Sequence, residues 1–335
     1  MNSRERFLAI IHGDRPDHPP LFTEGIREEV LLSWNCQGLS TGIDLDNLFQ
    51  YDQFEQLDPN VYPDPEIIDW SIPEKLLPLL RQRLNPEDPH RLPVDWSELV
   101  KGWKDRQYPL FLRIHPGLFL SLGIGDWQSF APALLRMVDQ PEYIHQILAI
   151  QAEFSAHLAE KVLCQVDLDG VIFSEPIAGN HGALVSARMY RTFALRSYSR
   201  ILTLLRDYQV PAIIWRSYAN PTNLLPEVLK YPFNALWLCE TPPNSLNLTQ
   251  LRKLVGPNIT LIGGIDSDVL RQDTQAIQQA IEAVRPLVEK GHFIPLADGR
   301  VREDVPYPNY LYYRQELYKA FVTGPGRDFS RLVRK

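Results

Sequence analysis

Residues 169–193 read DGVIFSEPIAGNHGALVSARMYRTF, and this stretch contains the pattern that decides the fold class. Gly170–Ser174 is a short run rich in β-branched and aromatic residues, which predicts a buried strand. After a loop, Ser186 is a residue type that caps helices, and it begins an amphipathic stretch that ends near Tyr208. A buried strand followed by an amphipathic helix is the unit from which parallel α/β folds are built.

The same unit recurs from about residue 109 to the end of the chain. The other predicted strands are Pro109–Ile114, Ala212–Trp215, Ala235–Cys239, Thr260–Gly263 and Phe293–Leu296. The predicted helices are Pro141–Leu163, Ser186–Tyr208, Asn223–Lys230, Leu246–Leu254 and Thr274–Lys290. Strands that alternate with helices in this way are expected to be parallel and joined by right-handed crossovers.

The first hundred residues are less regular and rich in proline. Ser3–Ile11 and Ile72–Leu84 are predicted helices, and Pro20–Thr23 and Gln50–Gln56 are candidates for the first two strands. Because no linker separates two cores, we expect residues 1–335 to form a single domain with an irregular N-terminal region, about 1–100. About eight strand–helix units in a chain of this length favour a closed (β/α)8 TIM barrel, with an open doubly wound sheet as the alternative.

The composition excludes several classes of protein. Hydrophobic residues make up 44% and charged residues 22% of the chain, so a disordered or fibrous protein is excluded. A net charge of −7 without a long Lys/Arg run argues against nucleic acid as a partner. Cys36, Cys164 and Cys239 lie far apart, which indicates a reducing compartment. With neither a membrane-length apolar run nor a signal-peptide core, we expect a cytoplasmic protein that does not bind membranes.

Nearly every predicted strand is followed by an ionisable residue. In a parallel barrel the chemistry takes place at the C-terminal ends of the strands, so these side chains are candidates for a site. In chain order they are Glu24, Arg27, His115, Glu175, Arg216, Tyr218, Glu240, Asp266, Asp298 and Arg300. Such a mixture can bind an anion through arginine forks and transfer protons through carboxylates. The ordinary alternative is that strand ends meet solvent and are polar for that reason alone.

Four segments resemble the uroporphyrinogen decarboxylase superfamily. Residues 3–20, SRERFLAIIHGDRPDHPP, are similar to its opening, and residues 169–193 are similar to its fourth strand and the following loop. Residues 259–270, ITLIGGIDSDVL, and residues 284–313, VRPLVEKGHFIPLADGRVREDVPYPNYLYY, are similar to its last two strands and closing helix. The resemblance covers nearly the whole chain. It implies a (β/α)8 barrel and, as in some members, a homodimer.

The superfamily contains two chemistries, and the resemblance is nearer to the second. One branch decarboxylates the acetate side chains of a tetrapyrrole without a cofactor, and the other contains corrinoid-dependent methyltransferases that commonly use zinc. The decarboxylases carry an RQAGRY signature, but residues 22–30 read FTEGIREEV here and retain only Arg27. The histidine expected near the last strand is also absent, and Gly299 stands near its place.

The zinc ligands of the methyltransferase branch are also replaced. That branch often has His-x-Cys or His-x-Asp after the fifth strand, whereas residues 215–221 read WRSYANP and put Arg216 and Tyr218 at the two ligand positions. Arginine stays protonated and cannot ligate zinc, and tyrosine is an uncommon ligand. We therefore expect a site without metal or other cofactor, and zinc or a corrinoid only if the methyltransferase alternative holds.

The leading hypothesis is metal-free, decarboxylase-type acid/base chemistry by a lyase on an anionic small molecule at the C-terminal mouth of the barrel. Arg216 would bind a substrate carboxylate, Glu175 or Asp298 would transfer the proton, and Tyr218 would orient the substrate. Further substrate-binding candidates are Arg27, His115, His181 and Asp266.

Each candidate residue also has an ordinary explanation. Arg216 would instead form an ion pair with Glu175 or Glu240, and Glu175 and Asp298 would be solvated carboxylates at strand ends. Tyr218 would be a packing aromatic. Asp266 would cap a helix, and His181 would lie on the surface.

Two other functions stay open. The first is a corrinoid-dependent methyltransferase with a modified zinc site, which would need a corrinoid protein as a partner. The second is a non-catalytic binder that kept the barrel and lost the chemistry, because family membership does not by itself fix function.

Overall fold

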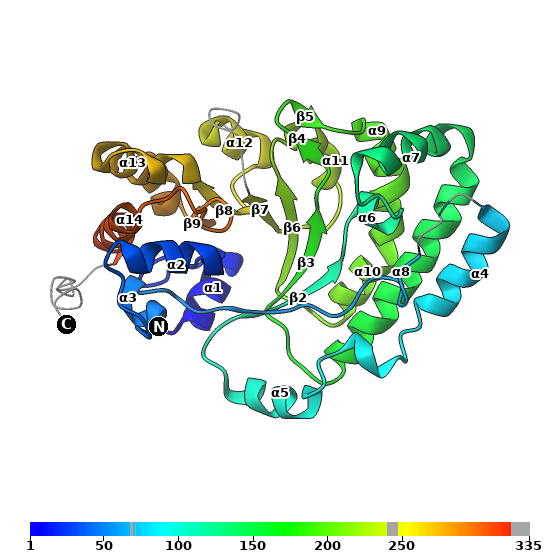
Figure 1. Cartoon of the computed structure of the whole chain (residues 1–335), viewed down its shortest axis with the longest axis horizontal. Helices are drawn as coiled ribbons and strands as arrows, with labels where there is room; N and C mark the ends of the chain where they lie inside the picture. Colours follow the sequence, from blue (N-terminus) through cyan, green and yellow to red (C-terminus); the bar gives the residue numbers. More distant parts are fainter. Residues whose placement is uncertain (68–69, 71, 240–246, 323–335) are drawn as a thin grey trace. The chain divides into compact units, whose positions relative to one another are not determined.

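The computed structural model describes residues 1–67, 70, 72–239 and 247–322 of the 335-residue chain. It is a mixed α/β fold in which parallel strands alternate with helices along the chain (Figure 1). The chain separates into two compact units, each discontinuous in sequence. Unit 1 comprises the described residues of Met1–Glu55, Gln107–Pro109 and Asn234–Lys335, and unit 2 comprises those of Gln56–Arg106 and Leu110–Phe233. The single domain expected from the sequence stays a prediction.

Unit 2 is built on a parallel sheet of β2 (Leu110–His115), β3 (Gly170–Glu175) and β6 (Ala212–Tyr218). The order is β2-β3-β6, with Phe111 opposite Gly170 and Gly170 opposite Ala212. These strands confirm the predicted apolar runs, begin within one residue of them and extend one to three residues further. Most strand residues are buried, as expected for a parallel sheet.

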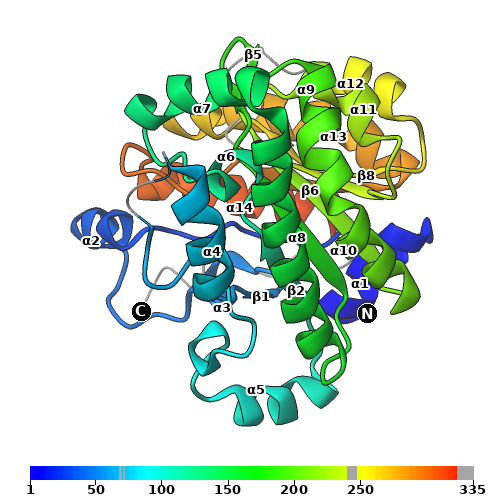
Figure 2. The same ribbon diagram turned by 90° about the vertical axis from the view of Figure 1, so that its right-hand side faces the viewer.

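Helices cover one face of this sheet. The long helix α8 (Pro141–Leu163) and α10 (Arg196–Asp207) lie side by side (Figure 2). The α10 residue Tyr198 contacts Phe173 of β3, with ring centroids 5.1 Å apart. The other helical elements of unit 2 are α4 (Pro73–Arg83), η1 (Pro89–Arg91), α5 (Trp96–Gly102), η2 (Trp103–Asp105), α6 (Leu118–Ser121), α7 (Trp127–Asp139), α9 (Ala187–Tyr190), η3 (Arg191–Leu195), η4 (Thr222–Leu224) and α11 (Leu225–Val228). A two-stranded hairpin of β4 (Ala178–Gly179) and β5 (Gly182–Ala183) follows β3.

Unit 1 contains a second set of parallel strands in the order β7-β8-β9. They are β7 (Ala235–Cys239), β8 (Thr260–Ile265) and β9 (Phe293–Ala297), and all three confirm predicted strands. Its helical elements are α1 (Ser3–His12), α2 (Glu28–Cys36), α3 (Leu45–Phe49), α12 (Leu248–Val255), η5 (Ser267–Arg271), α13 (Thr274–Lys290) and α14 (Tyr307–Phe321). Helices α13 and α14 pack side by side (Figure 1).

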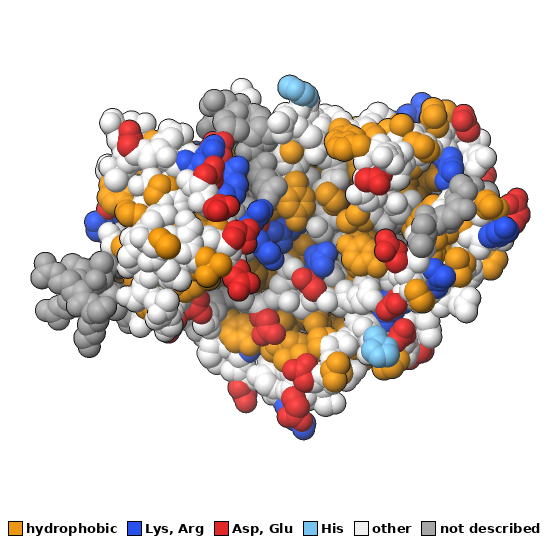
Figure 3. Space-filling view, viewed as in Figure 1, with side chains coloured by type: hydrophobic (Ala, Val, Ile, Leu, Met, Phe, Trp, Pro, Cys, Tyr) orange, Lys and Arg blue, Asp and Glu red, His pale blue; other side chains and the backbone are white. Residues whose placement is uncertain are grey.

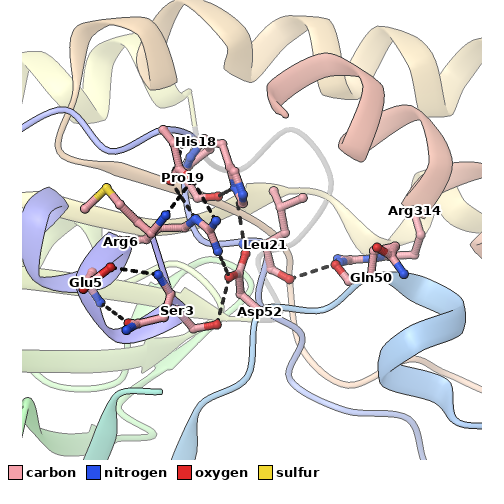
Figure 4. A network of polar contacts seen from close by, with 12 residues as sticks. Ser3, Glu5, Arg6, His18, Pro19, Leu21, Gln50, Asp52 and Arg314 are labelled. Atoms are coloured by element: carbon pink, nitrogen blue, oxygen red, sulfur yellow. Dashed lines mark hydrogen bonds and ion pairs between the residues drawn. The ribbon is translucent and has the colours of Figure 1, made fainter. Parts of the chain in front are cut away.

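The predicted first strand at Pro20–Thr23 is wrong. Its backbone bonds to the side chains of Asp52 and Arg314 and to the backbone N–H of Asp52, which donates to the Leu21 carbonyl at 3.2 Å (Figure 4). The Leu21 N–H donates to Asp52 Oδ2 at 2.8 Å, and the Arg314 guanidinium donates to the carbonyls of Leu21 and Phe22 at 3.0 and 3.3 Å. Proline at position 20 also has no N–H to offer a strand partner. The segment is therefore extended and buried without belonging to a sheet.

The predicted second strand at Gln50–Gln56 is correct only at its end, where β1 (Glu55–Leu57) begins. Gln50 has a left-handed backbone with φ of 54° and ends α3. Arg314 donates to the carbonyls at this helix end, Phe49 at 3.0 Å and Gln50 at 3.2 Å. The side chain of one late helix therefore fixes both N-terminal segments that the sequence pattern suggested as strands.

Helix length and surface charge bear on whether the chain contacts membranes or nucleic acids. No helix in the described ranges is both long and apolar enough to traverse a bilayer. On the face drawn in Figure 3, acidic and basic side chains are interspersed. This face therefore does not carry the single-sign basic patch typical of nucleic-acid-binding proteins.

Candidate functional site

The predicted site residues are divided between the two units. His115, Glu175, His181, Arg216 and Tyr218 belong to unit 2, and Arg27, Asp266 and Asp298 belong to unit 1. Glu240, the alternative ion-pair partner of Arg216, lies outside the described residues.

Glu175 ends β3 as a completely buried carboxyl group. Its Oε1 atom accepts the backbone N–H of Leu118, at the start of α6, at 2.8 Å. Its Oε2 atom accepts the hydroxyl groups of Tyr190, at 2.9 Å, and Tyr198. Tyr190 in turn accepts the indole N–H of Trp215 on β6 at 2.8 Å. The carboxyl group therefore links β3 to α6 and to the helix that contains both tyrosines.

A π-helical segment brings the two tyrosines together. Tyr190 ends α9, the π-helix η3 covers Arg191–Leu195, and Tyr198 lies in α10, so the helix is continuous from Ala187 to Asp207. In a regular α-helix, side chains eight positions apart differ by about 80° around the axis, because each residue turns the chain by ~100°. The wider π turn uses one additional residue and removes most of this difference. Both hydroxyl groups consequently point at Glu175.

The side chain of Glu175 lies on the helix-covered face of the sheet. Alternate strand residues share a face, and Phe173, two positions earlier, contacts Tyr198. Glu175 is in register with Ser217, whereas Ser174 is in register with Arg216 on the other face. The Glu175–Arg216 ion pair considered from the sequence is therefore not formed between these two described residues.

Burial sets the protonation of Glu175 and His115 on this face. It raises the pKa of Glu175 to about 7, although the hydrogen bonds from Tyr198, Leu118 and Tyr190 favour the charged form. It lowers the pKa of His115 to about 3, so this imidazole stays neutral near neutral pH. The Nδ1 atom of His115 accepts the Gly117 N–H at 3.0 Å, which places the proton on Nε2. His115 is therefore a buried neutral side chain and not a cation for binding an anion.

The opposite face of the same sheet carries Arg216. Trp215 bonds to Tyr190 on the helix side, so the alternating side chains of Arg216 and Tyr218 lie on the face turned away from the helix. The Nη1 atom of Arg216 donates to Gln56 Oε1 at 3.4 Å, and the guanidinium carbon is 5.7 Å from the centroid of the Tyr218 ring. Both side chains are half-buried at the C-terminal end of β6.

A second guanidinium group lies on this face and was not predicted. Arg113 of β2 is in register with Ile172, which is in register with Ile214, two positions before Arg216. Its Nε atom donates to Asp58 Oδ1 at 2.8 Å. The sequence contained one signal for it: Arg113 is the only charged residue in the apolar run PLFLRI at residues 109–114. A charged residue in a buried strand requires a polar partner, so a polar contact at this position could have been expected. We call Gln56, Asp58, Arg113, Arg216 and Tyr218 the arginine face.

In unit 1, Asp298 follows β9 and is buried. Its Oδ1 atom accepts the N–H of Gly264 at 3.1 Å. The preceding Gly263 has a φ of 118°, and a Cβ atom there would lie 2.6 Å from the Leu238 carbonyl oxygen. Only glycine fits this close approach of β8 to β7, which shapes the strand end beside Asp298.

Glu24, and not Arg27, reaches the strand ends of unit 1. Its Oε1 atom accepts from the indole of Trp237 at 3.1 Å, the thiol of Cys239 at 3.2 Å and the backbone N–H of Gly299 at 3.1 Å. Glu24 also lines a cavity of about 420 Å³. Arg27 is 45% exposed and lies 4.0 Å from Glu29 on α2. The sequence signal was present, because Glu24 directly follows the segment Pro20–Thr23 that was predicted as a strand.

The remaining two candidates have ordinary positions. Asp266 caps η5 by accepting the N–H of Asp268 at 2.8 Å, which was the alternative to substrate binding. His181 is exposed between the two strands of the β4–β5 hairpin.

The described side chains do not fit the zinc site of the methyltransferase branch. Within the part of the chain that the structure describes, no group of three or more His, Cys, Asp or Glu residues is arranged to hold a metal ion. At the end of β6 the two positions expected for ligands carry the guanidinium of Arg216 and the phenol of Tyr218. No step through zinc follows from these residues.

Comparisons with known proteins give the family from a family model and the fold from a solved structure. The family model described as uroporphyrinogen decarboxylase (URO-D) matches residues 125–299, just over half of the chain. No curated protein matches the chain. A methyltransferase from Methanosarcina mazei has a TM-score of 0.55 and 14% sequence identity, and the match covers 96% of this chain and 98% of that one. A similarity at this identity shows the fold alone. An endo-1,4-beta-xylanase from Penicillium canescens has a TM-score of 0.38 and 10% identity over 85% of this chain and 99% of its own, which is too low to support an argument.

Proposed function

Because the chain belongs to the uroporphyrinogen decarboxylase family, we propose that it is a metal-free enzyme with decarboxylase-type acid/base chemistry on an anionic small molecule. The observation that carries the proposal is Arg216, a half-buried guanidinium group at the C-terminal end of β6 on the face turned away from the helices. The proposal includes the closed (β/α)8 barrel, which the family match and the parallel strands of both units support.

Arg216 is suited to binding a carboxylate because its planar guanidinium group offers two parallel N–H donors. In a decarboxylation the bond from carbon to the carboxylate breaks, carbon dioxide leaves, and the electron pair stays on carbon and takes up a proton. A cation on the departing carboxylate would stabilise the ground state and slow this step. Arg216 therefore serves best on a second carboxylate that the substrate keeps, with Tyr218 beside it to orient the substrate.

The group that delivers the proton stays a prediction, with Asp298 and Glu175 as candidates. The raised pKa of Glu175, about 7, suits a general acid near neutral pH. Its described hydrogen bonds all go to groups of its own unit on the helix-covered face. This environment favours a positioning role for Glu175, and Asp298 stays a candidate for direct proton transfer.

The test measures binding of succinate by titration calorimetry at low ionic strength, with neutral succinamide as the control ligand. We expect Arg216→Ala to weaken succinate binding about tenfold or more, since a hydrogen bond to a charged group is lost. Arg216→Lys keeps the charge but not the fork and should give an intermediate affinity. Turnover is followed as carbon dioxide release from a panel of carboxylates and carboxylated tetrapyrroles. Unchanged binding and turnover in Arg216→Ala would refute the proposal.

Methyl transfer and ligand binding without turnover are separated by two further measurements. Stoichiometric, chelator-resistant zinc, measured by plasma mass spectrometry, would place methyl transfer first and call for a corrinoid protein as partner. A ligand that binds tightly through Arg216 and is never converted would identify a non-catalytic binder. The proposed homodimer is tested separately by light scattering.

A further inference from the structure

We propose that Gln56 and Asp58 are positioning residues that orient Arg216 for anion binding, with Arg113 holding Asp58 in place. This inference rests on the proposed function of Arg216. It concerns residues that neither touch the reacting atoms nor stand out in the sequence. Their contacts form one continuous chain across the arginine face, from β2 through β1 to β6.

The first step is the fixing of Asp58 by Arg113. The Nε atom of Arg113 lies 2.8 Å from Asp58 Oδ1, and the two side chains are 25% and 43% exposed. Arg113 is itself held by its strand, because its backbone neighbours on β2 are fully buried. An ion pair that starts from a rigid strand and is partly shielded from water restricts the carboxylate more than a pair between two mobile surface chains.

The second step is the orientation of the Gln56 amide by Asp58. The Gln56 Nε2 atom donates to both oxygens of Asp58, at 2.8 Å to Oδ1 and 3.0 Å to Oδ2. The reversed amide would place its oxygen against the carboxylate and its NH₂ group against the guanidinium of Arg216. Both contacts would be repulsive, because a carboxylate only accepts and a guanidinium only donates. The amide therefore has one stable orientation, with Oε1 directed at Arg216.

The third step is the contact of Gln56 with Arg216. Gln56 Oε1 accepts from Arg216 Nη1 at 3.4 Å, and the Tyr218 ring lies 5.7 Å from the guanidinium carbon. The amide supplies an acceptor without adding a negative charge. A carboxylate at position 56 would instead form an ion pair with Arg216 and compete with the carboxylate of a ligand. Glutamine is thus the residue that orients Arg216 and still leaves its attraction for anions in place.

A double-mutant cycle with succinate tests this relay by calorimetry. Gln56→Leu should weaken binding about two- to tenfold, the effect expected when one hydrogen bond that orients the guanidinium is lost. Gln56→Glu should weaken it more than Gln56→Leu, although glutamate is the closer match in shape. In an Arg216→Ala background, Gln56→Leu should have no further effect, because a positioning residue acts only through the residue that it positions. Gln165→Leu, a surface substitution in the same unit, is the matched control and should bind like the wild type.

The possible failures are distinguishable. Unchanged succinate binding in Arg216→Ala would overturn the proposed function itself. A loss in Arg216→Ala combined with normal binding in Gln56→Leu would overturn only the relay. The relay would also be overturned by an equal loss from Gln56→Leu in both backgrounds, or by Gln56→Glu binding better than Gln56→Leu. If Gln56→Leu does not fold, judged by circular dichroism, the uncharged and similarly long Gln56→Met in both backgrounds provides the same comparison.

Discussion

Replacing Glu175 with glutamine isolates the effect of a buried carboxyl group on stability. Burial raises the pKa of Glu175 from its ordinary value of 4.5 to about 7 in the folded protein. Between these two pH values the folded state holds a proton that the unfolded chain has already released. The free energy of unfolding of the wild type therefore decreases as pH rises through this window. Each pKa unit corresponds to about 1.4 kcal/mol, so the total loss is about 3 to 4 kcal/mol.

Glu175→Gln removes the ionisable group and keeps its size. Its free energy of unfolding should lack this contribution, so the variant should gain about 3 kcal/mol relative to the wild type between pH 4.5 and pH 8. A constant offset is expected from the amide NH₂ group, which faces hydroxyl and N–H donors. The assay is urea unfolding at a series of pH values, followed by tryptophan fluorescence.

Other titrating groups affect both proteins equally and cancel in the difference between wild type and Glu175→Gln. Glu98→Gln, which removes an exposed carboxylate on α5, is the control and should follow the wild type at every pH. A difference between Glu175→Gln and wild type that stays flat from pH 5 to pH 8 would show that Glu175 does not titrate in this range, and the reasoning from burial would be refuted.

Two further predictions concern the surroundings of the strand ends. Tyr198→Phe removes a donor that favours the ionised form of Glu175 in the folded protein, so the upper end of the pH window should move upward. The free energy of unfolding at pH 8 should fall by about 1 to 3 kcal/mol, measured by the same urea series. Gly263→Ala should lower the melting temperature more than Gly256→Ala, because both glycines have positive φ but only the Cβ atom at 263 meets backbone, at 2.6 Å from the Leu238 oxygen. Equal melting temperatures in calorimetry would show that β7 and β8 can separate without cost.

The strands of the second half were predictable because buried parallel strands are continuous apolar runs bounded by polar residues. Ala235–Cys239 is observed with the predicted bounds. The same reasoning failed at Pro20–Thr23, an equally apolar segment, because its partners are Asp52 and Arg314, and Arg314 is far away in sequence. Apolar composition predicts burial, but it does not say whether a strand or a side chain satisfies the backbone.

The candidate site was harder to predict, because the position of a residue along a strand does not give its face. Glu175 and Arg216 both end strands, and the register between β3 and β6 places them on opposite faces. Gln56 ends a predicted strand and Asp58 follows it, but both are recognised as part of the site only through their contacts with Arg113 and Arg216. A single sequence contains the residue types needed for an anion site, but the pairing of strands decides which of them meet.

The π turn between Tyr190 and Tyr198 has a consequence for comparing this chain with its relatives. A wide turn of this kind is equivalent to one residue inserted into an ordinary α-helix. Without the inserted residue the tyrosines would be seven positions apart, within about 20° of each other on a regular helix. A relative that keeps both tyrosines on a regular helix should therefore lack one residue in this region. Its sequence should align with this chain only when a one-residue gap is placed opposite residues 191–195. Deleting Thr192 should likewise regularise the helix and leave both hydroxyl groups directed at Glu175.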